Sequence, residues 1–365
     1  MRPRIAAVDI FCGCGGMTRG LLDAGITVLL GVDLDARAKE TYERNNLPSK
    51  FLHCDIRKIH GSDLLRYVDR REWDYLIMVA CAPCQPFSPM RKKPGHKQAR
   101  LLSQFGRLVM EVLPDVVLVE NVPWLGGIRG KRIWNRFVSQ LRWLGYICDS
   151  RVVDAKDYGV PQTRKRLLLV AAKGFVVEIP PPTHGRQGTV SREFETVRKA
   201  IVHYPPLQAG ECTPSVPNHK APSLTSLNIA RIRLIPRDGG SRSALPRRYV
   251  LRCHRDGSCH TDTYGRMAWD KPAPTLTAKC TGLSNGRFGH PSQDRAISVR
   301  EAAALQTFPD NFVFPEGIVY PTMLIGNALP VRLARLLGEA IFDAASSLNS
   351  DRIKVSPAPT AGDYP

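Results

Sequence analysis

The chain has 365 residues, of which 43% are hydrophobic and 23% charged, an ordinary composition for a globular protein with a large core. No apolar run is long enough to cross a bilayer, and the N-terminus lacks a signal-peptide pattern, so we expect an intracellular protein with no membrane attachment. The formal net charge of +19 favours a polyanionic partner, nucleic acid above all, although a basic surface can also serve solubility.

The ten cysteines are expected to stay reduced in such a compartment. Cys81 and Cys84 have the spacing of half a zinc or redox site, but no second half-site accompanies them. Cys253-His254 with Cys259-His260 is a better metal candidate by residue type, yet a polar turn separates the two pairs. We therefore predict no metal site.

The chain opens with a pattern that predicts a strand, a glycine turn and a helix. Residues 5–11 are apolar, Cys12-Gly13-Cys14-Gly15-Gly16 follows, and residues 17–24 have helical periodicity. Glycines let a ligand approach the backbone, and a helix N-terminus offers unpaired N–H groups. The glycine spacing differs from the dinucleotide fingerprint. The unit predicts nucleoside binding, with a plain tight turn as the alternative.

Acidic residues end the next two predicted strands. Residues 27–32 form the first of these and end at Asp33-Leu34-Asp35. An acid about 20 positions after the glycines is placed to bind ribose hydroxyls, so we assign Asp33 to the ribose and Asp35 to the N-cap of a helix over 36–45. The strand over 51–54 ends at Asp55-Ile56. Asp55 is predicted to accept a hydrogen bond from an adenine amino group, with Ile56 packing on the base; a surface aspartate is the alternative.

A cysteine follows the fourth predicted strand, over residues 73–79, in the stretch Pro83-Cys84-Gln85-Pro86-Phe87-Ser88-Pro89. The prolines exclude regular structure there. Cys84 thus stands just beyond the carboxyl end of a strand, where an open parallel sheet places its chemistry, unless it is only a buried inert thiol. The basic segment 91–100 comes next, and we expect it to close over a nucleic acid rather than to be a solvated loop.

Two further motifs flank later strands. A helix over 101–113 precedes the strand 116–119, which ends at Glu120-Asn121-Val122. A carboxylate at that position is either a structural acid or a general acid. After strands at 146–148 and 151–153, Gln162-Thr163-Arg164-Lys165-Arg166 precedes the strand 167–170. On an extended segment Arg164 and Arg166 point to the same side and can together clamp a phosphate or a base carbonyl.

The rhythm of strands and helices stops near residue 180. Residues 183–297 are rich in Arg, Gly, Pro and Ser, and the patches 247–252 and 273–277 predict short strands, so we expect a smaller, mostly β domain. Ser298 and Glu301 predict a capping box for a helix over 298–306. Gly326-Asn327-Ala328 precedes an apolar helix from 331 to about 346, and the polar tail 347–365 is predicted to be disordered.

Taken together, these motifs resemble those of the DNA cytosine-5 methyltransferases of bacterial and phage type, in the family's order, from Val8 to Ala345. The resemblance implies an α/β fold with a doubly wound, mostly parallel sheet, that of the class I, Rossmann-like methyltransferases dependent on S-adenosylmethionine. It also implies a smaller, mostly β target-recognition domain. The expected domains are 1–180, completed by 320–346, and 181–319, before the tail.

The same resemblance implies the reaction. A methyl group passes from S-adenosylmethionine to carbon 5 of a cytosine flipped out of double-stranded DNA at a specific short sequence, through a covalent bond between Cys84 and carbon 6. Glu120 would protonate N3, and Arg164 and Arg166 would hold the base carbonyl and the carboxylate. The residues that match cofactor-binding positions are Phe11, Gly13, Gly15, Gly16, Asp33, Leu34, Asp55, Ile56, Pro83, Asn327 and Ala328. The residues expected to contact DNA are Gln85, Ser88, Arg91, Lys92, Lys93, Gln162, Arg231 and Arg266.

Two positions depart from the family pattern. Leu34 occupies a position that is often aromatic and stacks on adenine, and Val331 replaces a second proline. The alternatives are a transfer-RNA cytosine methyltransferase, whose signature Pro123-Trp124-Leu125 lacks, a silent DNA-binding regulator, and an enzyme that attaches a different group. We expect a cytoplasmic, nucleoid-associated monomer, with a cognate restriction endonuclease, where one exists, acting separately.

Overall fold

The computed structural model describes residues 2–83, 96–127, 130–186, 190, 192–254 and 262–354, without the side chains of 96–100 and 349–354. The predictions for Cys84, Gln85, Ser88, Arg91, Lys92 and Lys93 therefore lie outside the described residues, as do those for Cys259 and His260. In the part of the chain that is described, no helix is both long enough and apolar enough to span a membrane.

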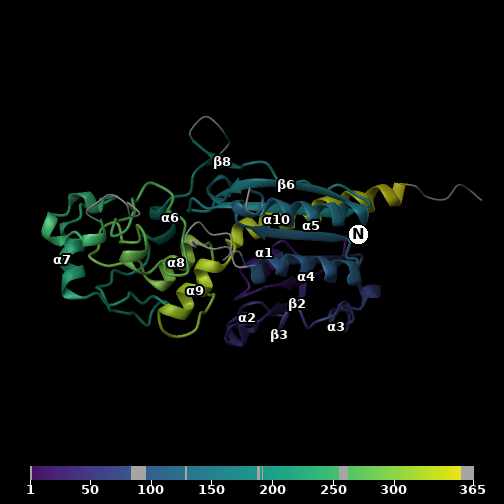
Figure 1. Cartoon of the computed structure of the whole chain (residues 1–365), viewed down its shortest axis with the longest axis horizontal. Helices are drawn as coiled ribbons and strands as arrows, with labels where there is room; N and C mark the ends of the chain where they lie inside the picture. Colours follow the sequence, from purple (N-terminus) through teal and green to yellow (C-terminus); the bar gives the residue numbers. More distant parts are fainter. Residues whose placement is uncertain are drawn as a thin grey trace, which may run out of the picture.

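A seven-stranded sheet forms the centre of the larger part of the molecule (Figure 1). The strand order is β3-β2-β1-β4-β5-β7-β6; β1 to β5 pair in parallel, whereas β7 is antiparallel to both of its neighbours. The predicted α/β class with a doubly wound, mostly parallel sheet is confirmed. The strands are β1 Ile5–Ile10, β2 Thr27–Asp33, β3 Lys50–His53, β4 Tyr75–Cys81, β5 Val116–Asn121, β6 Tyr146–Asp154 and β7 Lys165–Lys173.

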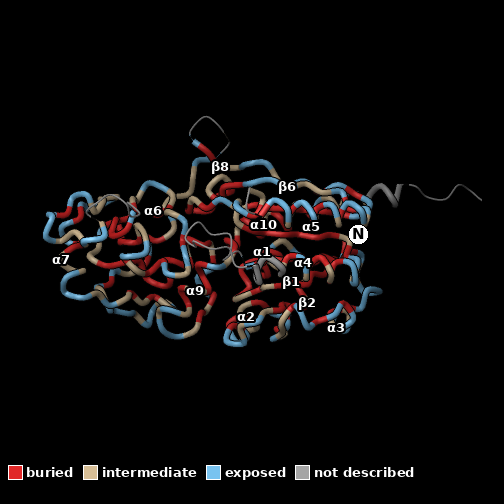
Figure 2. The backbone as a smooth tube through the Cα atoms, viewed as in Figure 1, coloured by how far each residue is buried: buried red, intermediate tan, exposed pale blue. Residues whose placement is uncertain are grey.

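Helices cover both faces of this sheet. Alternate residues of a strand face opposite sides, so Val8 and Ile10 join one hydrophobic core while Ile5 and Ala7 join the other. Figure 2 shows these strands buried between helices whose outer sides are exposed. The first core is covered by α3 Gly61–Leu65, α4 His96–Val112 and α5 Lys131–Trp143, and the second by α1 Gly16–Asp23 and α10 Val331–Lys354. The short helix α2 Lys39–Asn45 packs beside β3.

The last helix, α10, packs on α1 in the first half of the chain. A Cβ atom on Gly20 of α1 would lie 2.4 Å from the Cβ of Ala334 and 2.6 Å from the carbonyl oxygen of Val331. Glycine at this position therefore lets the backbones of α1 and α10 approach closely. The helix continues to Lys354, beyond its predicted end near residue 346, and the disorder of the rest of the tail stays a prediction.

The second part of the molecule contains little regular structure. Within the described residues of 181–319, the strands are the two-residue β8 His184–Gly185 and β9 Arg192–Glu193, and the helices are α6 Val197–Ile201, α7 Ser226–Leu234 and α8 Val299–Leu305. The predicted mostly β domain is wrong. The patch 247–252 contains the 3₁₀ helix Arg247–Tyr249, and 273–277 is a loop joined to Gln162 by one isolated bridge at Ala273. Proline and glycine spacing breaks strands in this region, and arginine side chains bind its loop carbonyls instead.

The boundary between the two predicted domains is crossed by a shared core. Cys12 and Tyr42 from the N-terminal part pack in one hydrophobic cluster with Val197, Val299 and Phe308. The division at residues 180 and 320 therefore stays a prediction. The capping box of α8 is confirmed, because Ser298 Oγ accepts a hydrogen bond from the Glu301 amide at 3.0 Å and the Glu301 carboxylate accepts one from the Ser298 amide at 2.7 Å.

The helix α9, Val319–Asn327, leads to the segment before α10. Gly326 and Asn327 thus end α9 instead of opening the late helix, and Ala328 is extended with φ −67° and ψ 151°. Pro330 explains the break, because the residue before a proline disfavours the helical conformation.

Candidate active site

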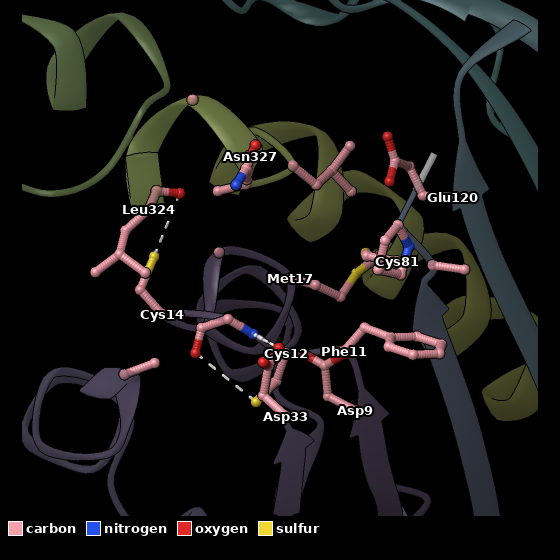
Figure 3. A pocket seen from close by; sticks show the side chains of 18 of the residues that line it. Asp9, Phe11, Cys12, Cys14, Met17, Asp33, Cys81, Glu120, Leu324 and Asn327 are labelled. Carbon is pink, nitrogen blue, oxygen red and sulfur yellow. Dashed lines mark hydrogen bonds between the residues drawn. The ribbon is translucent and has the colours of Figure 1, made fainter. Parts of the chain in front are cut away.

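The carboxyl ends of β1, β2, β4 and β5 meet the end of α9 around a cavity of about 280 Å³. Figure 3 shows Asp9, Asp33, Glu120 and Asn327 arranged around this cavity. The predicted site residues that line it are Phe11, Gly13, Gly16, Asp33, Pro83, Glu120, Arg164, Arg166, Asn327 and Ala328. The fold therefore brings residues from segments that are far apart in the sequence to the wall of one cavity.

A second cavity of about 250 Å³ adjoins the first, and Phe11, Asp33 and Pro83 line both. Its other walls are mostly apolar and include Leu34 and Ile56, and Asp55 contributes a carboxylate. The predicted cofactor positions therefore divide between two connected spaces.

Asp33 fixes the glycine turn. Its Oδ2 accepts a hydrogen bond from the Gly13 amide and its Oδ1 accepts one from the Asp35 amide, both at 2.9 Å. Gly15 does not line the cavity; its φ is +92°, and a Cβ atom there would lie 2.3 Å from Asn46 Nδ2. The role of Gly15 is therefore to shape the turn. Asp35 caps the next helical turn as predicted, by accepting from the Arg37 amide at 3.2 Å.

Asp9 of β1 is a cavity residue that the sequence reasoning missed. It is fully buried, its Oδ2 accepts a hydrogen bond from Thr18 Oγ1 at 2.7 Å, and its Oδ1 has no hydrogen-bond partner among the described residues. Burial raises the pKa of Asp9 to about 7; the Thr18 hydrogen bond opposes this shift and the charge of Asp33 adds to it. A carboxylate inside an otherwise apolar strand was the available signal.

Glu120 and Arg166 form a buried pair in the cavity wall. Arg166 Nε lies 2.6 Å from Glu120 Oε1, and the two side chains are 12% and 10% exposed. Glu120 is near the end of β5, and the antiparallel strand β7 brings Arg166 back beside it. The guanidinium therefore holds the carboxyl group in one orientation at the cavity.

Arg164 does not share this position. Its Nη1 donates to the Leu276 carbonyl at 2.7 Å, and its Nη2 donates to the Gly326 and Ala328 carbonyls at 2.9 and 3.1 Å. The predicted clamp of two arginines stays a prediction, because both line the cavity but their guanidinium groups have different partners in this structure. Alternation holds only within a regular strand, and β7 begins after Arg164, whose amide is bound by Asp154. Arg164 fixes the segment that carries Asn327 and Ala328.

Buried thiols surround the same cavity. Burial raises the pKa of Cys14 to about 12 and the pKa of Cys12 and Cys81 well above the usual thiol value; nearby carboxylates add to the shift for all three. These described thiols are therefore neutral near pH 7. The assignment of the nucleophile to Cys84 stays a prediction.

Three predicted DNA contacts are wrong, because the side chains are buried and engaged inside the protein. Gln162 is 0% exposed and bonds to Gln306 at 2.9 Å. Arg231 is 7% exposed and donates to the Tyr249 carbonyl at 2.9 Å. Arg266 is 0% exposed and donates to the carbonyls of Ile232, Ile235, His290 and Gln293. A guanidinium has five donors, which suits it to loops with many carbonyl groups that need partners.

No group of three or more metal-ligating side chains comes together within the described ranges. Cys253 is exposed there, while the second pair of that sequence candidate lies outside them.

Comparison with known proteins shows the family to which the chain belongs. The model of the C-5 cytosine-specific DNA methylase family matches residues 5–343. The Type II methylase M.HgiDII of Herpetosiphon aurantiacus is 41% identical over 345 residues, which cover 92% of this chain and 94% of that protein. The Type II methyltransferase M1.HphI of Haemophilus parahaemolyticus is 32% identical over 341 residues, which cover 92% and 86%.

A solved structure has the same fold. The crystal structure of a proposed DNA modification methyltransferase encoded within an E. coli prophage matches with a TM-score of 0.74 and 20% identity, covering 94% of this chain and 99% of that one. A family match over nearly the whole chain, joined to a buried Glu–Arg pair in a cavity at the strand ends, establishes the identity: this chain belongs to the C-5 cytosine-specific DNA methylases and is a DNA (cytosine-5) methyltransferase.

Proposed function

We propose that this enzyme transfers a methyl group from S-adenosylmethionine to carbon 5 of a cytosine flipped out of double-stranded DNA, at a specific short sequence. The observation that carries the proposal is that the buried Glu120–Arg166 pair faces the same cavity as Phe11, Asp33 and Asn327. The carboxyl group proposed to bind the base, Glu120, and the residues proposed to bind the methyl donor therefore line the same cavity.

The two cavities suit the methyl donor. The apolar cavity with Asp55 at its edge fits a purine that carries an amino group, and Asp33 lies where both cavities meet, as a ribose diol requires. The first cavity holds the buried Asp9 with its unpartnered Oδ1, which fits the positive charge of the methionine part. Asn327 and Ala328 would hold the same part. When bound, S-adenosylmethionine supplies an electrophilic methyl group.

The chemistry on the base requires three roles from the protein. Carbon 5 of cytosine is a poor nucleophile, and a bond from the Cys84 thiolate to carbon 6 makes carbon 5 able to attack the methyl group. Negative charge develops on the ring during that addition, and a proton from Glu120 to N3 neutralises it. Arg166 keeps the Glu120 carboxyl group aimed at the base. Water then takes the carbon 5 proton, the electron pair of that bond forms the double bond between carbons 5 and 6 and expels the Cys84 thiolate, and the proton on N3 returns to Glu120.

The test is transfer of labelled methyl from S-adenosylmethionine to unmethylated genomic DNA by the wild type and by Cys84→Ser. We expect label on carbon 5 of cytosine with the wild type alone, and bisulfite sequencing of the product will then give the target site. Wild type that binds S-adenosylmethionine but labels no DNA, from several sources, contradicts the DNA substrate and directs the test to transfer RNA or to a regulatory role.

The Type II names of the relatives favour a role in a restriction-modification system, with the endonuclease as a separate protein. A single flipped base needs one active site, which favours a monomer. Deleting the gene for the methyltransferase where a neighbouring nuclease is active tests the first point: cleavage of host DNA is expected.

Exposed arginines in the second part of the molecule are better candidates for DNA contact than the buried ones. Arg247, Arg248 and Arg252 are exposed, and residues 241–254 contain no acidic side chain. Elsewhere in this part, ion pairs already occupy Asp262, Asp270, Asp294 and Glu301. Among the described residues no carboxylate pairs with these three side chains, so their positive charge fits DNA phosphates.

Replacing Arg247, Arg248 and Arg252 together by alanine is expected to weaken DNA binding. The slope of log affinity against log salt decreases by about 0.9 for each phosphate that the protein no longer neutralises, so we expect a decrease of about 2 to 3. Fluorescence anisotropy over a salt series measures this. The control replaces Arg4, Arg66 and Arg71, which are exposed near the amino ends of the strands, and an equal decrease there would contradict the assignment.

A further inference from the structure

Arg57 binds the carboxylate that lines the apolar cavity. Its Nε lies 2.9 Å from Oδ1 and 3.0 Å from Oδ2 of Asp55, and its Nη2 also donates to Oδ2. The Arg57 amide donates to Oδ1 at 3.0 Å. The Asp55 side chain is only 13% exposed, whereas the Arg57 side chain is 60% exposed, and both residues line the apolar cavity.

The same local pattern, Asp-x-Arg, occurs at three other places in the described chain; Asp149 and Arg151 form one pair within β6, at 2.6 Å, and the other two pairs lie at turns. Arg37 binds Asp35 through Nε and Nη2, both at 2.8 Å, and Arg71 binds Asp69 at 3.0 and 2.7 Å. In each case the arginine amide also donates to the aspartate, so the turn itself favours the pairing. Asp69 lines neither cavity and its side chain is 41% exposed, so that pair serves as a natural reference.

We propose that Arg57 is a positioning residue for recognition of the purine amino group: it holds Asp55 in the one orientation that presents an acceptor to the apolar cavity. This inference rests on the proposed cofactor. Each oxygen accepts from two donors of Arg57, Oδ1 from the amide and Nε and Oδ2 from Nε and Nη2, so these contacts fix the rotation of the carboxylate beside the cavity. Membership of the family does not by itself require an arginine at this position for that task.

The residues around Asp55 increase the contribution of a hydrogen bond between Asp55 and the purine amino group to cofactor binding. Leu34, which lines the same cavity, is 63% exposed and offers an aliphatic wall without an aromatic face. The hydrogen bonds from Arg57 lower the pKa of Asp55 to about 2, so the carboxylate is an acceptor only across the working pH range. A purine with an amino group then gains a charge-assisted hydrogen bond, and a purine without an amino group lacks that hydrogen bond.

The test compares S-adenosylhomocysteine with its 6-desamino analogue, in which hydrogen replaces the amino group. Isothermal titration calorimetry gives the dissociation constant of each for the wild type, Arg57→Ala and Arg57→Lys. We expect the wild type to prefer the adenine compound by about tenfold to a hundredfold, as a hydrogen bond to a charged group implies. Arg57→Ala is expected to bind the adenine compound about tenfold more weakly and the analogue almost unchanged, and Arg57→Lys is expected to lie between them.

The matched control is Arg71→Ala, which removes the same local pairing away from both cavities and is expected to leave both constants unchanged. Thermal denaturation of each variant checks the fold. Equal weakening of both compounds in Arg57→Ala would show a merely structural effect and overturn the inference, and tighter adenine binding would show competition and overturn it too. Failure of the wild type to bind either compound would instead overturn the proposed cofactor.

Discussion

Glu120→Gln is expected to lower kcat for DNA methylation by about 10³-fold, within the range that a general acid contributes. Glutamine keeps the size of the side chain and can still accept from Arg166 Nε, which lies 2.6 Å from Oε1 in the native enzyme, but it has no acidic proton to give to N3. Because the interaction that is removed belongs to the transition state, kcat and kcat/KM should fall together. Single-turnover methyl transfer measures the chemical step directly.

Two further measurements separate this effect from misfolding. The affinities for S-adenosylhomocysteine and for DNA should change less than about threefold, because Gln keeps the polar contact in the cavity wall. The matched control is Glu339→Gln on α10, where the carboxylate forms an exposed pair with Arg335 and activity should be unchanged. A kcat within tenfold of wild type for Glu120→Gln would show that Glu120 is only a structural acid.

The sequence predicts the first half of the fold well for a physical reason. Each parallel strand is buried on both faces, so its sequence is a continuous run of apolar residues. The functional residues follow directly after the end of each run, at the carboxyl end of the strand. Asp33, Asp55 and Glu120 were found in this way, and the structure places all of them at cavity walls. The order of the motifs carried the family assignment, which the comparisons confirm.

The structure of the second part of the molecule, residues 181–319, was poorly predicted because periodic apolar residues are not what stabilises its fold. Arg266 and Arg295 are fully buried, and each binds several oxygen atoms of loops and acids. A sequence pattern shows an arginine but not the carbonyl groups that the folded loops will present to it, so buried and DNA-facing arginines look alike. Arg164 and Arg166 illustrate the same limit two residues apart: both line the cavity, but Arg164 binds backbone carbonyls whereas Arg166 pairs with Glu120.

Asp9 shows a different limit, since its isolated position in an apolar strand gives no sign of its surroundings. Only the fold reveals that α1 supplies Thr18 to one oxygen, and that the other oxygen is buried at the cavity without a partner among the described residues. A buried carboxylate of this kind destabilises the folded protein whenever it is ionised. The enzyme therefore carries a cost in stability at the place where we propose that a cation binds.

Asp9→Asn is expected to stabilise the protein without ligand at pH 8 and to weaken cofactor binding. The native pKa is about 7 and the usual value 3.8, so ionisation is disfavoured in the folded state. The resulting penalty is absent below the unfolded pKa, grows as the pH rises and is complete above about pH 7. The shift corresponds to about 4 kcal/mol as an upper bound, and we expect a gain of about 2 kcal/mol in the free energy of unfolding at pH 8. Urea unfolding should show a smaller gain at pH 5.

Asp9→Asn is expected to weaken cofactor binding at the same pH at which it stabilises the protein without ligand. A bound cation favours ionised Asp9, so the wild type should bind S-adenosylmethionine more tightly as the pH rises through 7, with release of a proton. Asp9→Asn should lose that pH dependence and should bind the cofactor at least about tenfold more weakly at pH 8. Calorimetry in buffers of different ionisation enthalpy measures the proton directly. Asp23→Asn, at the exposed end of α1, is the matched control and should change neither quantity. If Asp9→Asn keeps the wild-type pH dependence of binding, Asp9 does not meet the cation of the cofactor. If it lowers the stability at pH 8, the ionised carboxylate carries no penalty in the folded protein.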